Sequence, residues 1–141
     1  MAVLSDFAVG QELFVRTFGI SRADLVEYAN ASGDHNPIHQ DLEAARAAGL
    51  PDVIAHGMYT MGLASRAVLE WADAQGLDAS LSEFNARFAK PVVVPADAGA
   101  EIQVTAKVRK LHEDGALEIN LVVTSGSDKV LAPARATFRA A

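Results

Sequence analysis

The chain has 141 residues, no cysteine and a formal net charge of -6 at pH 7. This length can bury a substantial core, and we expect one domain over residues 1–141. The composition excludes disulfides, thiolate metal ligands and cysteine nucleophiles, and the negative charge argues against nucleic acid as a partner.

The N-terminal stretch MAVLSDFAVG lacks a basic region followed by a long apolar run, so we expect no signal peptide. No apolar stretch of the sequence approaches the roughly 20 residues that span a bilayer. We therefore expect a cytoplasmic protein with no membrane partner.

The first predicted elements are a strand over residues 11–18 and a helix that follows it. Ser21 is suited to the helix N-cap, and Asp24 three residues later completes a capping-box pattern. Apolar residues then recur at helical spacing at Leu25, Val26 and Ala29. This helix is expected to end near Gly33, where a polar loop begins.

The loop SGDHNPIHQD, at residues 32–41, contains two aspartates, two histidines and an asparagine. Asn36-Pro37 fixes a turn, because proline sets its own φ and disfavours helix at the residue before it. Asp34 and His39 can converge across this turn. A carboxylate and an imidazole around one shared water form a minimal acid–base pair.

Two other interpretations of the loop stay open. Aspartate, asparagine, glycine and proline are ordinary turn residues, so the loop could be purely structural. Imidazole and carboxylate also suit zinc, with a candidate ligand set of His35, His39, Asp41 and His56. Pro37 opposes such a site, because the spacing of the first two histidines suits a metal only on a helix. We therefore do not favour a metal at this loop.

Two more helices are predicted, over residues 42–48 and 58–74. Asp41 can cap the first of them, and Gly49 can end it. Apolar residues cover nearly every side of the second, which is typical of a buried helix. These residues are Met58, Tyr59, Met61, Leu63, Ala64, Ala67, Val68, Leu69 and Trp71.

The C-terminal half changes to a period of two, which predicts four half-buried antiparallel strands. Asp114-Gly115 and Ser125-Gly126 supply turns between them, and Pro133 is expected at an edge or a bulge. The apolar positions of the four strands are Phe84, Ala86 and Phe88; Ile102, Val104, Ala106 and Val108; Leu117, Ile119, Leu121 and Val123; and Ala132, Ala134, Ala136 and Phe138.

These elements predict an α+β architecture in which a curved antiparallel sheet wraps around the helix at residues 58–74. Such a sheet covers only one side of a helix that is apolar on all sides. The other side must meet another surface, so we expect an oligomer.

Two separated segments of the sequence carry a resemblance to a known family. YANASGDHNPIHQD followed by IAHGM resembles the MaoC-like (R)-specific enoyl hydratases and (3R)-hydroxyacyl-thioester dehydratases, whose motif is D-x-N-P-x-H, a short helix and H-G-M. EFNARFAKPVVVPAD looks like the R-F-x-x-P-V strand of the family. Within the family, the chain looks closest to the catalytic subunit of mycolic-acid-type hydroxyacyl-ACP dehydratases. The matching motif residues are Asp34, Asn36, Pro37, His39, His56, Gly57 and Met58.

The resemblance implies a hotdog fold, with a long central helix wrapped by a curved antiparallel sheet. It implies a homodimer, or a heterodimer with a homologous hotdog subunit. The implied reaction is the reversible hydration of a trans-2-enoyl thioester to a (3R)-hydroxyacyl thioester, carried on coenzyme A or acyl carrier protein. No metal or redox cofactor takes part.

The resemblance also implies catalytic roles. Asp34 and His39 would share one water, with His39 moving the proton at carbon 2 because imidazole titrates near working pH. Gly57 would supply an oxyanion hole, because N–H groups at a helix start are unpaired and glycine allows close approach.

Other candidates are assigned more loosely. Asn36 is expected to position the loop or the water, and His56 to fix the turn into the helix. Arg87, Lys90 and Arg135 are candidates for phosphate contacts. The candidate substrate-binding residues are Asn36, His56, Met58, Tyr59 and Phe84.

Two alternative functions remain on the same fold. A hotdog thioesterase typically uses a carboxylate on or near the central helix, but residues 58–69 contain none and Glu70 comes late. A non-catalytic acyl-binding subunit of a heteromeric dehydratase is the second alternative, although this chain keeps the acid–base pair.

Overall fold

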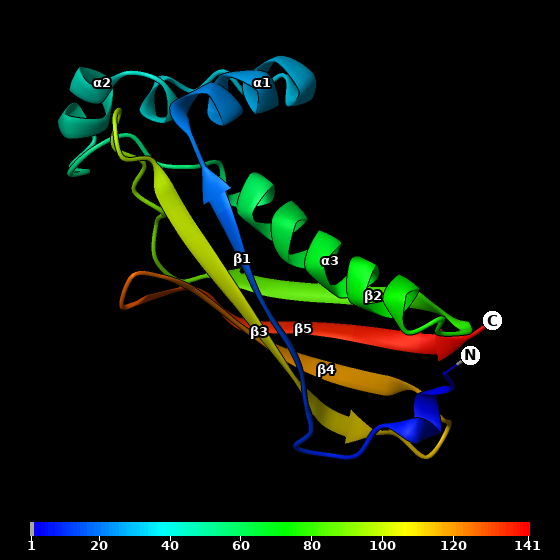
Figure 1. Cartoon of the computed structure of the whole chain (residues 1–141). Helices are drawn as coiled ribbons and strands as arrows, with labels where there is room; N and C mark the ends of the chain where they lie inside the picture. Colours follow the sequence, from blue (N-terminus) through cyan, green and yellow to red (C-terminus); the bar gives the residue numbers. More distant parts are fainter. Residues whose placement is uncertain (1) are drawn as a thin grey trace.

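The computed structural model describes residues 2–141, and its elements follow the predicted order (Figure 1). A single-turn 3-10 helix precedes the first strand, and another lies in the polar loop. The elements are η1 (Leu4–Asp6), β1 (Glu12–Ile20), α1 (Arg22–Ser32), η2 (Pro37–His39), α2 (Leu42–Ala47), α3 (Gly57–Ala74), β2 (Ala79–Phe88), β3 (Ala100–Leu111), β4 (Leu117–Ser125) and β5 (Asp128–Ala140).

The five strands form one antiparallel sheet in the order β1-β3-β4-β5-β2, so β1 and β2 are its edges. Figure 1 shows α3 lying across one face of the twisted sheet, with α1 and α2 gathered together at one end. The predicted α+β architecture is confirmed. Over residues 2–141, the helices lack the combination of length and hydropathy that crossing a membrane requires.

The core lies between α3 and the inward face of the sheet. β4 shows the predicted alternation most cleanly, since Leu117, Ile119, Leu121 and Val123 are all buried. They meet the buried side of α3, which includes Trp71. Burying one such side chain stabilises the fold by about 1.5–3 kcal/mol, so this contact holds α3 rigidly on the sheet.

The helices that flank the polar loop are capped as predicted. Ser21 Oγ accepts from the Asp24 N–H at 3.1 Å, while Asp24 Oδ2 accepts from the Ser21 N–H at 2.9 Å. α1 ends at Gly33 with φ 79°, a left-handed value that suits glycine. The Asp41 carboxylate accepts from the Glu43 N–H at 3.2 Å and starts α2. Both ends of the loop are therefore fixed.

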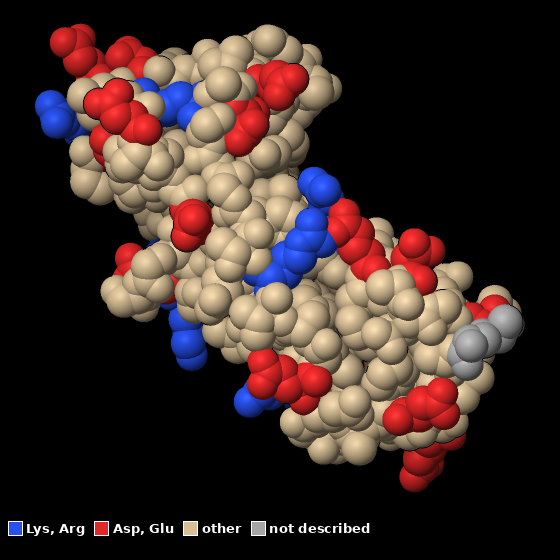
Figure 2. Space-filling model, viewed as in Figure 1, with Lys and Arg blue, Asp and Glu red and all other residues tan. Residues whose placement is uncertain are grey.

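The prediction that α3 is apolar on all faces is wrong. Arg66 and Glu70 form an ion pair on its outer side, and Glu70 also pairs with Arg16 of β1. Figure 2 shows basic and acidic side chains side by side on this face of the molecule. Met58 and Leu69 are 59% and 48% exposed. The helix therefore has one buried face and one mixed face that contacts water.

Pro133 lies at a bulge and not at an edge, because β5 runs between β4 and β2. The register of β5 shifts near Pro133 against both neighbours. A proline has no N–H to donate, and a bulge removes the need for one.

Candidate active site

Short side-chain hydrogen bonds shape the loop between α1 and α2. Asp34 Oδ1 accepts from the Asn36 N–H, and Asn36 Oδ1 accepts from the Ile38 N–H, each at 3.2 Å. Ser32 Oγ accepts from the Asp34 N–H, also at 3.2 Å. These consecutive turns hold the Asp34 backbone and one of its carboxylate oxygens. Asn36 thus contributes one of the hydrogen bonds that shape the loop.

His39 is buried, and its environment defines its tautomer. Its Nδ1 lies 2.7 Å from the carbonyl oxygen of Ile54, just before α3. A carbonyl oxygen can only accept, so Nδ1 carries the proton and the neutral ring keeps a lone pair on Nε2. The Ile54 N–H donates to the Ile38 carbonyl at 3.2 Å and docks the loop against this segment. The arrangement gives His39 the free nitrogen that a general base needs.

His56 lies behind His39. The two rings stack with centroids 3.9 Å apart and planes 24° apart, and the ring of Tyr28 meets His56 edge-on at 4.8 Å. His56 Nε2–H donates to the backbone carbonyl of Asp34 at 3.0 Å. Burial lowers the pKa of His56 below its ordinary value, although the hydrogen bond to Asp34 opposes this effect. Burial of the ring therefore favours its neutral form.

A pocket of about 460 Å³ lies beside these residues. Asp34, His39 and Gly57 all line it, so the structure brings the three predicted catalytic residues to one cavity. Its remaining wall is mainly apolar and includes Ile54, Met58, Phe88, Val92, Val130 and Leu131. Such a pocket can take an apolar chain next to an acid–base pair.

Gly57 is the first residue of α3, and a side chain at this position would crowd Phe88. A Cβ at this position would lie 3.0 Å from the nearest ring carbon of Phe88. The first N–H groups of a helix have no partner within it. Within residues 2–141, the Gly57 and Met58 N–H groups donate to no backbone carbonyl outside the helix. The pocket thus borders two unpaired donors at the positive end of a helix dipole.

Four of the predicted substrate-binding residues lie outside the wall that this chain builds around the pocket. Asn36 is in the loop turn and His56 is buried behind His39. Tyr59 packs against Tyr28 at 5.2 Å, and burial raises the pKa of its hydroxyl. Phe84 packs against the core from the edge strand. Of the five, only Met58 lines the pocket.

Sequence reasoning missed several residues of the pocket. Thr60, which is buried, follows Gly57 by three positions on α3, and helical spacing could have identified it. Leu131 reaches the pocket only because β5 pairs with β2, where it is the partner of Phe88. That register is a long-range property with no local sequence signal.

Only one of the three candidate phosphate contacts is near the site. Lys90 lines the pocket and forms an ion pair with Asp128 at 3.3 Å. Arg87 and Arg135 line a separate hollow, because neighbouring residues of a strand point to opposite faces of the sheet.

The potential metal ligands that lie close together in the structure differ from the set that the sequence suggested. Donor atoms of Asp34, His39 and His56 lie within 4.8 Å of one another, whereas Asp41 caps α2. A metal ion must lie near the plane of each imidazole that binds it. The stacked, nearly parallel rings of His39 and His56 cannot both aim a lone pair at one ion. The arrangement fits proton transfer better than metal binding.

The site can therefore support a specific chemistry. A carboxylate and a neutral imidazole can hold one water and exchange protons with it. The unpaired donors at the start of α3 can stabilise a negative oxygen. The apolar wall can hold the rest of a substrate.

Comparisons with known proteins agree with these features. A family model described as a MaoC like domain matches residues 7–126. The 3-hydroxyacyl-thioester dehydratase X of Mycobacterium tuberculosis is 48% identical over 80 residues, covering 57% of this chain and 26% of that protein. A solved MaoC-like dehydratase aligns with TM-score 0.91 and 36% identity, covering 99% of this chain and 42% of the other.

An unliganded R-hydratase of Pseudomonas aeruginosa aligns with TM-score 0.77 and 26% identity, covering 97% of this chain and 84% of the other. The fold implied by the resemblance is confirmed by these structures. The chain spans about a quarter of the length of the curated dehydratase and less than half of the first solved structure.

Proposed function

The chain belongs to the MaoC-like domain family, and from this premise we propose that it catalyses the reversible hydration of trans-2-enoyl thioesters to (3R)-hydroxyacyl thioesters. One observation carries the proposal. Asp34 and His39 face a mainly apolar pocket that also borders the start of α3. We propose coenzyme A or acyl carrier protein as the carrier of the acyl group.

The proton transfers follow from the tautomer of His39. In the dehydration direction, Nε2 of His39 accepts the proton from carbon 2, next to the thioester carbonyl. The bond between carbon 3 and its hydroxyl breaks as the carbon–carbon double bond forms. The same proton joins the departing hydroxyl, which leaves as water held by Asp34. Hydration follows the same steps in reverse. Neither direction involves oxidation, reduction or a cofactor.

Negative charge develops on the thioester oxygen during this reaction. We assign its stabilisation to the N–H groups at the start of α3, above all that of Gly57. A donor of this kind typically contributes about 100-fold or more in rate. The close approach of Phe88 to Gly57 suggests why no side chain stands at this position.

The alternative of thioester hydrolysis typically uses a carboxylate on or near the central helix of a hotdog fold. Glu70 is the first acidic residue of α3, and it pairs with Arg16 and Arg66 on the outer face of the helix. It lines none of the pocket that holds Asp34 and His39. The contacts of Glu70 therefore favour the hydratase over the thioesterase.

The test is an incubation of the purified protein with (3R)-hydroxybutyryl-CoA, following enoyl-thioester absorbance and free thiol in the same sample. We expect enoyl absorbance to rise without thiol release, and prolonged chelation to leave the rate unchanged. Release of thiol without enoyl formation would establish the thioesterase instead. Loss of activity together with stoichiometric zinc would overturn the metal-free mechanism.

A further inference from the structure

His56 has no part in the reaction described above, although it contacts every catalytic part of the site. It is 1% exposed and lines no part of the pocket. Its Nε2–H holds the Asp34 backbone, and its ring face lies on the ring of His39. It is also the N-cap residue of α3, directly before Gly57.

We infer that His56 is a positioning residue, which holds the Asp34 backbone and the His39 ring in place from behind the pocket. The inference rests on the proposed function and extends it. Asp34 is exposed and belongs to a loop, and its own side chain makes only local turn contacts. The bond from His56 ties that loop to the start of α3, which links the carboxylate to the oxyanion donors.

The contacts of His56 require it to be neutral. With Nε2–H bonded to Asp34, the ring has a lone pair on Nδ1, which is buried and has no hydrogen-bond partner within residues 2–141. A charged ring would place a second N–H there with no acceptor, which is costly. It would also face His39 and His35 of the loop, which oppose a second charge, whereas the Asp34 carboxylate favours one; burial is the largest effect and keeps the pKa of His56 low.

A neutral ring in this position is useful for the reaction. His39 must gain and lose a proton, and a second charged imidazole 3.9 Å away would oppose its protonation. Stacking also limits rotation of the His39 ring about the axis set by its bond to Ile54. The stacking thus keeps Nε2 in one orientation, and small misplacements of such groups can cost about 100-fold in rate.

Two substitutions separate the contributions of His56. His56→Phe keeps a ring on His39 but removes the donor to Asp34, whereas His56→Gln keeps an amide N–H and removes the ring. We expect kcat of His56→Phe to fall about 100-fold with KM nearly unchanged. The kcat of His56→Gln should be about tenfold higher than that of His56→Phe. His112→Gln, in the turn after β3, is the matched control and should keep wild-type kinetics.

Measurements of kcat, KM and melting temperature distinguish a positioning role of His56 from a failure of the variants to fold. Equal losses in both variants, with KM rising in step and melting temperatures falling, would show a merely structural role. A wild-type kcat in His56→Phe would overturn the inference directly. If His56→Phe does not fold, a wild-type kcat in His56→Gln, which lacks the ring stacked on His39, would also overturn it.

A measurement on the wild-type protein is independent of activity. In nitrogen-15 spectra of the histidine side chains, we expect His56 to be neutral with its proton on Nε2 at pH 7, and to become charged only at a lower pH than an ordinary histidine. Protonation on Nδ1 in the neutral ring, or a His56 that becomes charged at or above the ordinary pH, would refute the inference. Absence of hydratase activity with this signature intact would instead refute the proposed function alone.

Discussion

Asp34 and His39 have different environments, and these suit them to different tasks. Asp34 is exposed at the pocket and makes turn contacts through one oxygen. His39 is buried and bonded through Nδ1, so its free nitrogen is Nε2. A carboxylate can therefore hold the water while the imidazole moves the proton. If the two residues share one water in this way, they should act as a unit.

The first prediction concerns this pair. Asp34→Asn and His39→Gln should each lower kcat for hydration of crotonyl-CoA by about 100-fold or more, because each removes one half of the proton relay. The double variant should be little slower than the slower single variant, since residues that act as a unit are not additive. Stopped-time assays of the three variants measure this.

Circular dichroism of the same variants serves as the control for folding. Losses that multiply in the double variant would mean that the two residues act independently. That result would contradict the shared water.

Single residues also show what the sequence could predict. Asp34, His39 and Gly57 were identifiable because their motif is local, and all three line one pocket. The stacking of His56 on His39 was not, because it depends on where two segments 17 positions apart meet in the folded chain. Leu131 was missed for the same reason, since strand register sets its place.

At the level of elements, α3 has the largest influence on the site, because its first residue borders the pocket. The sequence predicted this helix correctly. The prediction that it is apolar on all faces overlooked Arg66 and Glu70, which form an ion pair on its outer side. The strands were predicted more accurately, because an alternating pattern identifies the inward face directly. The exception is β2, whose edge position leaves Phe88 half exposed.

The second prediction concerns the start of α3. Gly57→Ala should lower kcat by at least about tenfold, because its Cβ would meet the Phe88 ring at 3.0 Å and crowd the oxyanion donors. Gly62→Ala, in the same helix, has open space around the new Cβ and should gain about 0.5–1 kcal/mol of stability with normal kcat.

Adding Phe88→Ala to Gly57→Ala tests the cause. Partial recovery of kcat is expected if the clash is responsible. A Gly57→Ala variant with wild-type kcat would contradict the close approach at this position.

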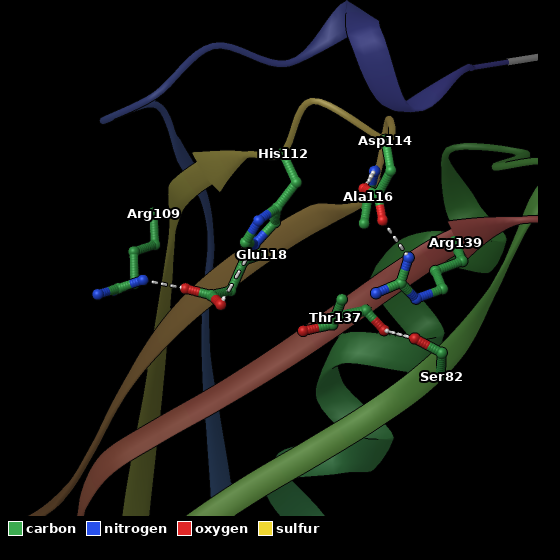
Figure 3. Close-up of polar contacts among 8 residues, drawn as sticks. All are labelled: Ser82, Arg109, His112, Asp114, Ala116, Glu118, Thr137 and Arg139. Atoms are coloured by element: carbon green, nitrogen blue, oxygen red, sulfur yellow. Dashed lines mark hydrogen bonds and ion pairs between the residues drawn. The ribbon is translucent and has the colours of Figure 1, made fainter.

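The third prediction concerns the hairpin of β3 and β4, shown in Figure 3. Burial raises the pKa of Glu118, but the hydrogen bonds and positive charges of Arg109 and His112 together outweigh burial and hold the pKa below the ordinary value of 4.5. His112, 3.5 Å away, acts in the same direction. A carboxyl group whose pKa is lower in the folded than in the unfolded chain stabilises the fold at pH values above its unfolded pKa. This stabilisation is lost as the pH falls through the folded pKa.

Glu118→Gln should therefore lower the melting temperature at pH 7, and the difference from wild type should shrink below about pH 4. Glu113→Gln removes the same charge from the same hairpin. Glu113 has no ion-pair partner in the described part of the chain, so this control should show little change. A Glu118→Gln deficit that persists undiminished at low pH would show that packing, and not the charge, is responsible.

On the scale of the whole molecule, the pocket is unfinished in one chain. Met58 and Phe88 line it and yet are 59% and 53% exposed. β2, which carries Phe88, is an edge strand with free backbone groups. A second chain over β2 and the start of α3 would cover these residues. These exposed pocket residues indicate a partner, whereas the outer side of α3 carries the Arg66–Glu70 ion pair and is not apolar.

The fourth prediction is that the protein works as a dimer, alone or with a homologous partner, in which the second chain completes the pocket. Dilution should dissociate the dimer and lower the specific activity over the same concentration range. Sedimentation and crotonyl-CoA hydration, measured on the same samples, test this. A fully active monomer would rule out the shared pocket.

The central claim is that Asp34 and His39 hydrate an enoyl thioester in this pocket. The most direct measurement incubates wild type and Asp34→Asn with crotonyl-CoA and resolves the configuration of the product. The account predicts (3R)-hydroxybutyryl-CoA from wild type and almost none from Asp34→Asn. A (3S) product from wild type, or equal product from both proteins, would contradict it.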